Sequence, residues 1–120
     1  MSNASPGSRR ALGAALLTLA ALFLAWELYG ALRWVRDAGG LGNAFHHFWQ
    51  AITSDWMALI VITDHLLIAG VVLVALWVDA LRCGWAVTRR LLLAAAFMAL
   101  GSPTLLAYLA WRVRRGIAAR

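Results

Sequence analysis

The sequence is poor in charge and contains no lysine. Only 13% of its 120 residues are charged, with five acidic side chains and eleven basic ones, all arginine, whereas soluble domains carry about 25%. Hydrophobic residues make up 63% of the chain, and the mean hydropathy is +0.76. A domain of this size buries only about 60–70% of its surface. The composition therefore excludes an ordinary soluble domain and favours a protein covered by lipid.

Cysteine and catalytic motifs are also scarce. The single cysteine, Cys83, excludes an internal disulfide. The sequence has no G-x-S-x-G, H-E-x-x-H, P-loop or dinucleotide-binding motif, and no zinc-ligand spacing. We therefore expect no enzyme activity, no metal and no cofactor. Nucleic-acid binding is not expected either, despite a net charge of +6, because the arginines stand in short groups beside apolar runs.

Three long apolar runs predict an all-α membrane protein with three transmembrane helices. They cover residues 11–32, 57–78 and 91–111, between a disordered polar tail at 1–10 and an arginine-rich tail at 112–120. The 22 residues of the second run would extend about 33 Å as a helix, against about 30 Å of hydrocarbon. Pro103 cannot donate to the carbonyl of Ala99, so we expect a kink in the third run. The whole chain, 1–120, is predicted to be a single membrane domain.

A short amphipathic helix is predicted over residues 43–53, after the first span. Phe45, Phe48, Trp49 and Ile52 recur at helical spacing on one side. Asn43 is a candidate cap for this helix, which we expect to lie in the headgroup plane. Thr53-Ser54-Asp55 then offers an N-cap for the second span, where Asp55 would face the positive helix end.

The first apolar run could also belong to a signal peptide, since Arg9 and Arg10 precede it. No small-x-small cleavage site follows promptly, and Glu27, Arg33 and Arg36 occupy the region where cleavage should occur. We therefore prefer a retained spanning helix.

Arginine counts do not orient three spans. The first tail and second loop hold five arginines, and the first loop and C-terminal tail hold six, of which Arg120 is distant from the membrane. Three arrangements stay open: an orientation set by a partner or by the Arg112–Arg115 cluster, a dual topology, and a re-entrant hairpin at Gly101-Ser102-Pro103. The hairpin would place residues 89–90 and 112–115 on one side, but it would need shielding by protein.

Polar side chains at similar depth predict a polar cluster inside the membrane. An acid at mid-bilayer costs about 2.5–3.5 kcal/mol, which the Leu, Ile and Val residues of the second run offset with about 4–8 kcal/mol. Asp64 should therefore face protein or water. Counting about 1.5 Å per residue from the run ends puts the other spans' polar groups in the same layer. The predicted cluster is Glu27, Asp64, His65, Ser102 and Thr104.

Our preferred role for this cluster is to hydrogen-bond the helices to one another. A proton-exchanging site is the sharper alternative, because two acids and a histidine in low dielectric would have shifted pKa values. A third reading makes His65 a haem or pigment ligand, although no paired ligand on a facing helix is evident.

Small residues form a stripe along the first span. Ala11, Ala14, Thr18, Ala21 and Ala25 step by three and four, which lets another helix approach closely. Alanine is also simply common in this chain. Together with the run Ala94–Ala96, the stripe favours packing within the chain.

From Phe48 onward, the pattern resembles a bacterial family of small three-helix membrane proteins known only as a domain of unknown function. The resemblance covers residues 48–115. It is carried by Ser54-Asp55-Trp56, Asp64-His65-Leu66-Leu67, Asp79-x-x-Arg82 with Gly84-Trp85, Gly101-Ser102-Pro103, and Leu105-Leu106-x-Tyr108-Leu109. His65 is not part of the family's pattern. The resemblance implies the architecture and no activity.

These observations predict a multi-pass protein of a bacterial inner membrane; arginine without lysine indicates a GC-rich bacterial genome. The expected function is that of a non-catalytic accessory or binding subunit, whose partners are the lipid bilayer and either another membrane protein or further copies of the chain. The alternative is a small homo-oligomeric proton-coupled carrier or channel using Glu27 and Asp64.

Overall fold

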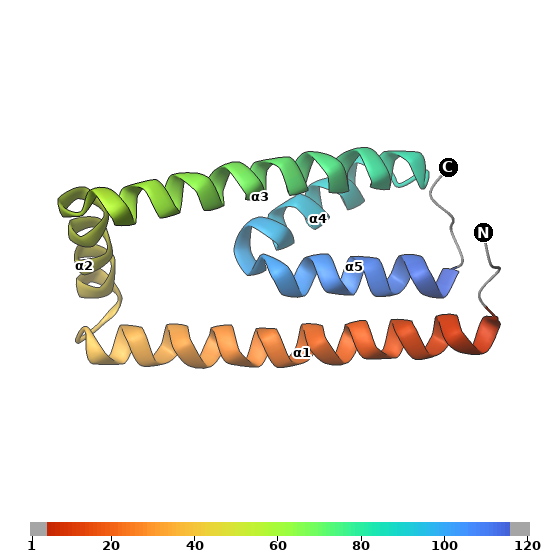
Figure 1. Cartoon of the computed structure of the whole chain (residues 1–120), viewed down its shortest axis with the longest axis horizontal. Helices are drawn as coiled ribbons and strands as arrows, with labels where there is room; N and C mark the ends of the chain where they lie inside the picture. Colours follow the sequence, from red (N-terminus) through yellow and green to blue (C-terminus); the bar gives the residue numbers. More distant parts are fainter. Residues whose placement is uncertain (1–4, 116–120) are drawn as a thin grey trace. The chain divides into compact units, whose positions relative to one another are not determined.

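The computed structural model describes residues 5–115, which form five helices joined by short turns, with no strand in that range. The helices are α1 (Pro6–Asp37), α2 (Leu41–Ser54), α3 (Trp56–Arg82), α4 (Val87–Leu100) and α5 (Ser102–Arg115) (Figure 1). They form two compact units. The terminal unit comprises residues 1–24 and 75–120, and the central unit comprises residues 25–74. The all-α fold class is confirmed.

Two of the described helices, α1 and α3, are long and apolar enough to cross a membrane. Only 11% of the most apolar stretch of α1 and 6% of that of α3 are buried. A helix in the core of a soluble protein would instead bury most of such a stretch against its neighbours. Side-chain exposure therefore agrees with the lipid cover that the composition predicts.

The first helix begins earlier than expected. The Ser5 hydroxyl accepts a hydrogen bond from the Ser8 amide at 3.3 Å, and Pro6 opens the helix, where its missing N–H has no consequence. The disordered tail predicted for residues 1–10 is therefore wrong for residues 6–10, and residues 1–4 lie outside the described range. At the other end of the chain, α5 continues through Arg115, and the rest of the predicted tail lies outside that range.

The start of α3 follows the predicted cap. The Asp55 carboxylate accepts a hydrogen bond from the Met57 amide at 2.9 Å, while the Asp55 backbone is extended. This is the geometry of an aspartate N-cap, and it confirms the role expected of Asp55. The cap expected for α2 is wrong, because the helix begins at Leu41 and Asn43 lies within its first turn.

A glycine turn ends α3 and positions the aromatic residue that follows. Gly84 has a φ of 74°, which side-chain-bearing residues rarely adopt. Its amide donates to the Leu81 carbonyl, and the Trp85 amide donates to the Ala80 carbonyl, each at 3.0 Å. These two bonds form a Schellman motif. The motif fixes the position of Trp85 directly after the helix.

The third apolar run is two helices. The α4 helix ends at Leu100, Gly101 turns the chain with a φ of 58°, and Pro103 lies in the first turn of α5 (Figure 1). The Thr104 hydroxyl donates to the Ala96 carbonyl at 3.0 Å, which ties the start of α5 to α4. The single kinked helix expected over 91–111 is therefore wrong. Each 14-residue helix is about 21 Å long, so a third span is not confirmed.

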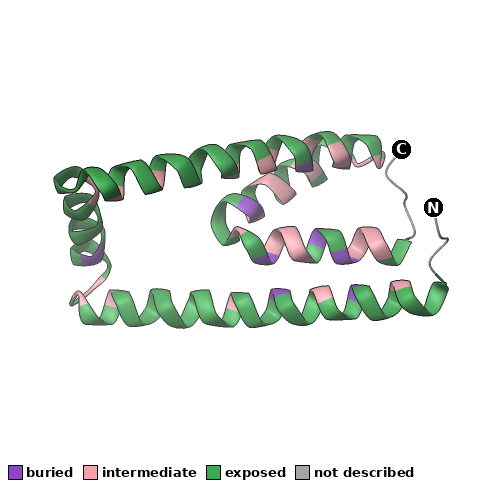
Figure 2. Ribbon diagram, in the orientation of Figure 1, coloured by how far each residue is buried: buried purple, intermediate pink, exposed green. Residues whose placement is uncertain are grey.

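Buried side chains lie mostly in the terminal unit (Figure 2). In this unit, the buried residues are Ala20, Leu76, Ala80, Phe97, Tyr108 and Ala110, with Gly13 and Pro103. The central unit buries only Ala44. Tyr108, with its hydroxyl, is the only buried residue in 5–115 that carries a polar side-chain group. Among the described helices, α4 and α5 pack most closely, and the buried residues of this unit also include positions near the start of α1 and the end of α3.

The face of α1 that packs is not the predicted one. Gly13 and Ala20 are buried, and a Cβ atom on Gly13 would lie 2.6 Å from Cγ of Arg114. The predicted stripe is exposed throughout its length, at Ala11, Ala14, Thr18, Ala21 and Ala25. The prediction that this stripe packs within the chain is therefore wrong, because α5 approaches α1 closely at Gly13, on a different face of the helix.

Candidate functional site

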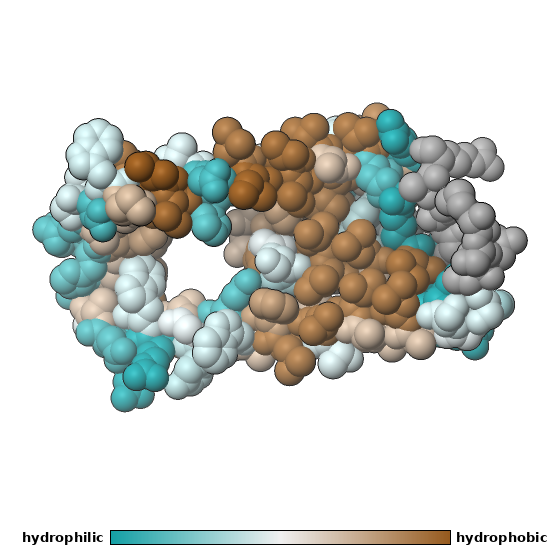
Figure 3. All heavy atoms as spheres, viewed as in Figure 1, coloured by the Kyte–Doolittle hydropathy of each residue, from teal (hydrophilic) through white to brown (hydrophobic). Residues whose placement is uncertain are grey.

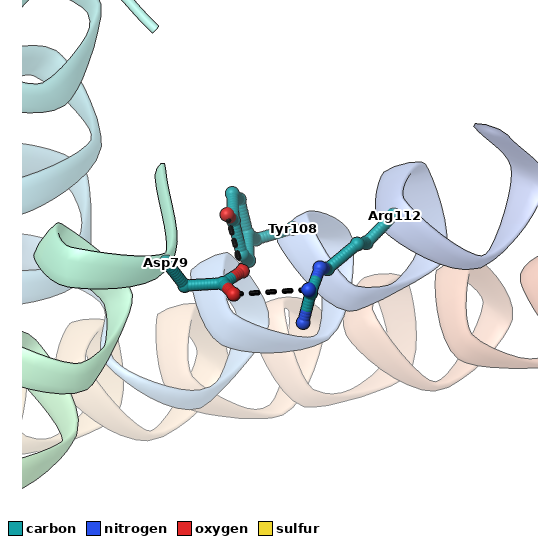
Figure 4. A network of polar contacts seen from close by, with 3 residues as sticks. All are labelled: Asp79, Tyr108 and Arg112. Atoms are coloured by element: carbon teal, nitrogen blue, oxygen red, sulfur yellow. Dashed lines mark hydrogen bonds and ion pairs between the residues drawn. The ribbon is translucent and has the colours of Figure 1, made fainter. Parts of the chain in front are cut away.

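A network of polar contacts in the terminal unit joins α3 to α5. Asp79 lies one turn before the end of α3, and its two carboxylate oxygens bind different partners (Figure 4). The Tyr108 hydroxyl donates to Oδ2 at 2.7 Å, and Nη2 of Arg112 lies 3.0 Å from Oδ1. Tyr108 and Arg112 are four residues apart on α5 and so share one helix face. We call these three residues the Asp79 clasp.

Partial burial makes this contact more costly to break than a surface ion pair. The Asp79 and Arg112 side chains are 22% and 20% exposed, and Tyr108 is buried. Coulomb attraction grows as water is removed from around a pair, and an unpaired charge becomes costly there. Burial, and then the hydrogen bond to Asp79, raise the pKa of the Tyr108 phenol. The phenol therefore stays protonated and keeps donating at neutral pH.

Two tryptophan rings pack against the Tyr108 ring of the clasp. The Trp85 ring meets the Tyr108 and Trp111 rings edge to face, with centroids 5.5 and 4.9 Å apart. Such pairs contribute about 0.5–1.5 kcal/mol each beyond their buried area. The Arg115 guanidinium lies over the Trp111 ring at 5.6 Å. The turn after α3 is thereby fixed to α5 at a second place.

The clasp is built to hold helices together. Its carboxylate is neutralised by a guanidinium, and its phenol proton is already engaged. Within residues 5–115, no three His, Cys, Asp or Glu side chains gather as metal ligands would. The chemistry of these groups favours a structural role over a catalytic one.

Asp64 occupies a different environment, on the central-unit part of α3. It is exposed and borders an open hollow of about 340 Å³ with Trp56, Leu59, Ile60, Thr63 and Leu67. All the lining residues belong to α3. Within the central unit, Asp64 forms no hydrogen bond or ion pair in the described structure. No hydrogen-bond donor in the described central unit therefore pairs with the Asp64 carboxylate.

The neighbours of Asp64 are satisfied by their own helix. The Thr63 hydroxyl donates to the Leu59 carbonyl at 2.8 Å, and Nδ1 of His65 lies 2.7 Å from the Val61 carbonyl oxygen. A carbonyl can only accept, so Nδ1 donates the proton of this hydrogen bond. The Thr63 hydroxyl and one His65 ring nitrogen are thus hydrogen-bonded within α3, whereas the Asp64 carboxylate has no such partner in the described central unit.

The predicted polar cluster remains a prediction. Glu27 is exposed on α1, and no hydrogen bond or ion pair links it to Asp64 or His65 in the described central unit. Ser102 and Thr104 belong to the terminal unit. Ser102 is exposed at the start of α5, while the Thr104 hydroxyl is used inside the hairpin.

The predicted interfacial residues lie on α2, whose helical state is confirmed. Phe45 and Trp49 are 62% and 67% exposed, and Ile52 is half-buried. The Phe48 ring meets the Trp34 ring of α1 edge to face, with centroids 6.2 Å apart. Most of the apolar face of α2 therefore stays open.

The Asp79 clasp was missed by the sequence reasoning, although its parts were visible. The sequence contains an acid in the last turns of an apolar helix and a Tyr–Arg pair spaced by four, but Arg112 was interpreted only as part of the cluster that could set the membrane orientation. Nothing local pairs residues 29 positions apart. No protein-family model, curated protein or solved structure matches the chain.

Proposed function

We propose that the chain is an integral protein of a bacterial inner membrane, in which α1 and α3 cross the bilayer and α3 binds a transmembrane helix of another protein. It would act as a non-catalytic subunit of that assembly. The exposed apolar surface of both helices supports a lipid environment, because an apolar surface of this extent needs cover. The arginine-only basic composition supports the bacterial source.

The proposal of a partner helix rests on Asp64. It lies eight residues into α3, beside Leu66 and Leu67, which are 64% and 67% exposed. An acid facing acyl chains there would cost about 2.5–3.5 kcal/mol. No donor from the central unit offsets that cost. A neighbouring helix with an Arg, His, Asn or Ser side chain at this depth would offset it, and the open hollow beside Asp64 gives such a side chain room.

The helix α2 would rest on the membrane surface. Phe45 and Trp49 are exposed on its apolar side, while His46, His47 and Gln50 take the other side. A helix with this division lies in the headgroup plane with its apolar face in lipid. The rings of α2 would then fix the depth at which α3 begins.

Carbonate washing tests membrane integration, and purification in mild detergent tests the partner. We expect the chain to stay in washed membranes and to copurify with one stoichiometric membrane protein. Asp64→Leu should remain in the membrane at normal abundance but lose that partner. Leu66→Val is the control, since Leu66 is exposed on α3 but does not border the hollow beside Asp64.

Release by carbonate would overturn the membrane assignment, and a partner that survives Asp64→Leu would overturn the role of Asp64. Recovery of a monodisperse homo-oligomer alone would also count against an accessory subunit. If the wild-type protein then catalyses proton flux in proteoliposomes and Asp64→Asn abolishes that flux, the chain is the proton-coupled carrier.

A further inference from the structure

Arginine is divided unequally between the two units. Among the described residues, the terminal unit holds eight arginines and one acid, Asp79. The central unit holds two arginines and four acids. The eight arginines are Arg9, Arg10, Arg82, Arg89, Arg90, Arg112, Arg114 and Arg115. Only Arg112 forms an ion pair within the described part of this unit, so most of the positive charge has no internal counter-charge.

The fold brings these arginines to one end of the terminal unit. The turn at Gly101 sends α5 back beside α4, so that the start of α4 and the end of α5 lie on the same side of the hairpin (Figure 1). The contact between Asp79 and Arg112 holds that end of α5 against the last turns of α3. The contact between Gly13 and Arg114 brings in the first turns of α1. Segments that are distant in sequence thus form one basic surface.

Aromatic and apolar side chains surround the same surface. Trp85 and Trp111 lie at this end, and the Arg90 guanidinium lies 5.0 Å from the Trp77 ring centroid. Apolar side chains cover much of the hairpin face seen in Figure 3. Among the hairpin residues, Leu92 and Met98 are 66% and 67% exposed. Tryptophan and arginine side chains next to exposed apolar side chains are typical of protein surfaces at a membrane interface.

We propose that this arginine surface binds the anionic phospholipid headgroups of the cytoplasmic leaflet, and that the α4–α5 hairpin enters that leaflet without crossing it. The chain would then cross the membrane twice, with the start of α1, the α3–α4 turn and the end of α5 on the cytoplasmic side. The inference rests on the membrane location proposed above. For three spans, the arginines were divided almost equally between the two sides of the membrane. For two spans, eight described arginines would lie on the cytoplasmic side and two on the opposite side, as the positive-inside rule requires.

Lipid headgroups suit this surface better than a soluble polyanion does. The arginines adjoin the ends of two apolar helices, where phosphate groups are present at high density. Long arginine side chains reach the headgroup level while their stems stay in apolar surroundings. The hairpin backbone is paired within its own helices, so partial insertion leaves few polar groups without partners.

Labelling with a membrane-impermeant maleimide in inverted inner-membrane vesicles tests the topology. Native Cys83, half-exposed in the α3–α4 turn, reports the proposed cytoplasmic side. A Cys83→Ser, Arg115→Cys protein reports the end of α5, and a Cys83→Ser, Gln50→Cys protein reports α2 on the opposite side. We expect the first two proteins to be labelled and the third to be protected.

Labelling of Cys83 with protection of the cysteine at position 115 would indicate a third span and overturn the inference. All labelling uses carbonate-washed membranes. A protein that is released by the wash refutes the proposed membrane location, whereas a protein that stays but shows another labelling pattern refutes only the two-span topology.

Lipid retention tests the ligand. The protein is reconstituted in phosphatidylcholine vesicles containing phosphatidylglycerol, purified in mild detergent, and its bound lipids are measured by mass spectrometry. Replacing Arg89, Arg114 and Arg115 by Gln should lower phosphatidylglycerol retention at least about fivefold, the effect of a single arginine near an anionic surface. Arg33→Gln with Arg36→Gln is the matched control and should retain wild-type levels.

Equal loss in both sets of variants, or none in either, would overturn the lipid assignment. Displacement of the retained lipid by millimolar inorganic phosphate would also overturn it, since the surface would then bind any free phosphate.

Discussion

The Asp79–Arg112 ion pair allows the packing of the terminal unit to be tested quantitatively. Asp79→Asn keeps the shape of the side chain and an oxygen that accepts the Tyr108 hydroxyl, so the variant removes mainly the charge. Exposed pairs contribute about 0–1 kcal/mol, while breaking a fully buried pair costs about 3–5 kcal/mol. With side chains 22% and 20% exposed, we expect Asp79→Asn to lower the free energy of unfolding by about 2 kcal/mol.

A double-mutant cycle separates the pair from its surroundings. Arg112→Gln should cost a similar amount, because it leaves the carboxylate partly buried without its counter-charge. The double variant should cost less than the two single variants together, with a coupling energy of about 1–2 kcal/mol. The matched control is the exposed Arg33–Asp37 pair of α1, at 3.6 Å with side chains 68% and 64% exposed, whose coupling should stay below about 0.5 kcal/mol.

Titration with sodium dodecyl sulfate in mild detergent micelles, followed by tryptophan fluorescence and far-ultraviolet circular dichroism, measures these energies. Coincident transitions are required before free energies are compared. A coupling energy for Asp79 and Arg112 no larger than that of the Arg33–Asp37 control would refute the reasoning, because it would show that burial adds nothing to this pair.

Three further predictions concern Tyr108, the hairpin turn and the α3 cap. Because the pKa of the Tyr108 phenol is raised in the folded protein, the phenol keeps its proton above about pH 10, where the unfolded protein loses it. Stability should therefore be complete below that pH and fall by about 1.4 kcal/mol per pH unit above it, measured as unfolding midpoints between pH 8 and 11. Gly101→Ala should destabilise the chain by about 1–2 kcal/mol because of its φ of 58°, whereas Gly70→Ala, within α3, should be neutral or stabilising in the same detergent titration. Asp55→Ala should cost about 1 kcal/mol and raise amide hydrogen exchange in the first turn of α3, since the Met57 amide loses its acceptor.

Each of these predictions has an internal control. Tyr108→Phe should abolish the alkaline loss, and persistence of the loss would assign it to another group. Equal effects at Gly101 and Gly70 would show that backbone strain at the turn is not the cause. Asp55→Asn should keep most of the cap, so a cost as large as that of Asp55→Ala would point to charge rather than to the hydrogen bond.

The elements determined by nearby residues were predictable from the sequence. The apolar runs beginning at residues 11 and 57 gave the long helices α1 and α3, since length and hydropathy decide whether a helix can cross a membrane. The helical spacing of Phe45, Phe48 and Trp49 indicated α2. The Asp55 cap followed because its acceptor and donor are two residues apart.

Tertiary structure decided which helix faces meet and how the last run folds. A Gly-Ser-Pro sequence is compatible with a kink or with a full reversal, and the reversal in this chain is accompanied by contacts of α5 with α4, with Asp79 and with Trp85. Helix azimuth cannot be read from composition, so the packed face of α1 at Gly13 was missed. The grouping of eight arginines in one unit likewise depends on the turn at Gly101, because only long-range contacts bring distant charges together.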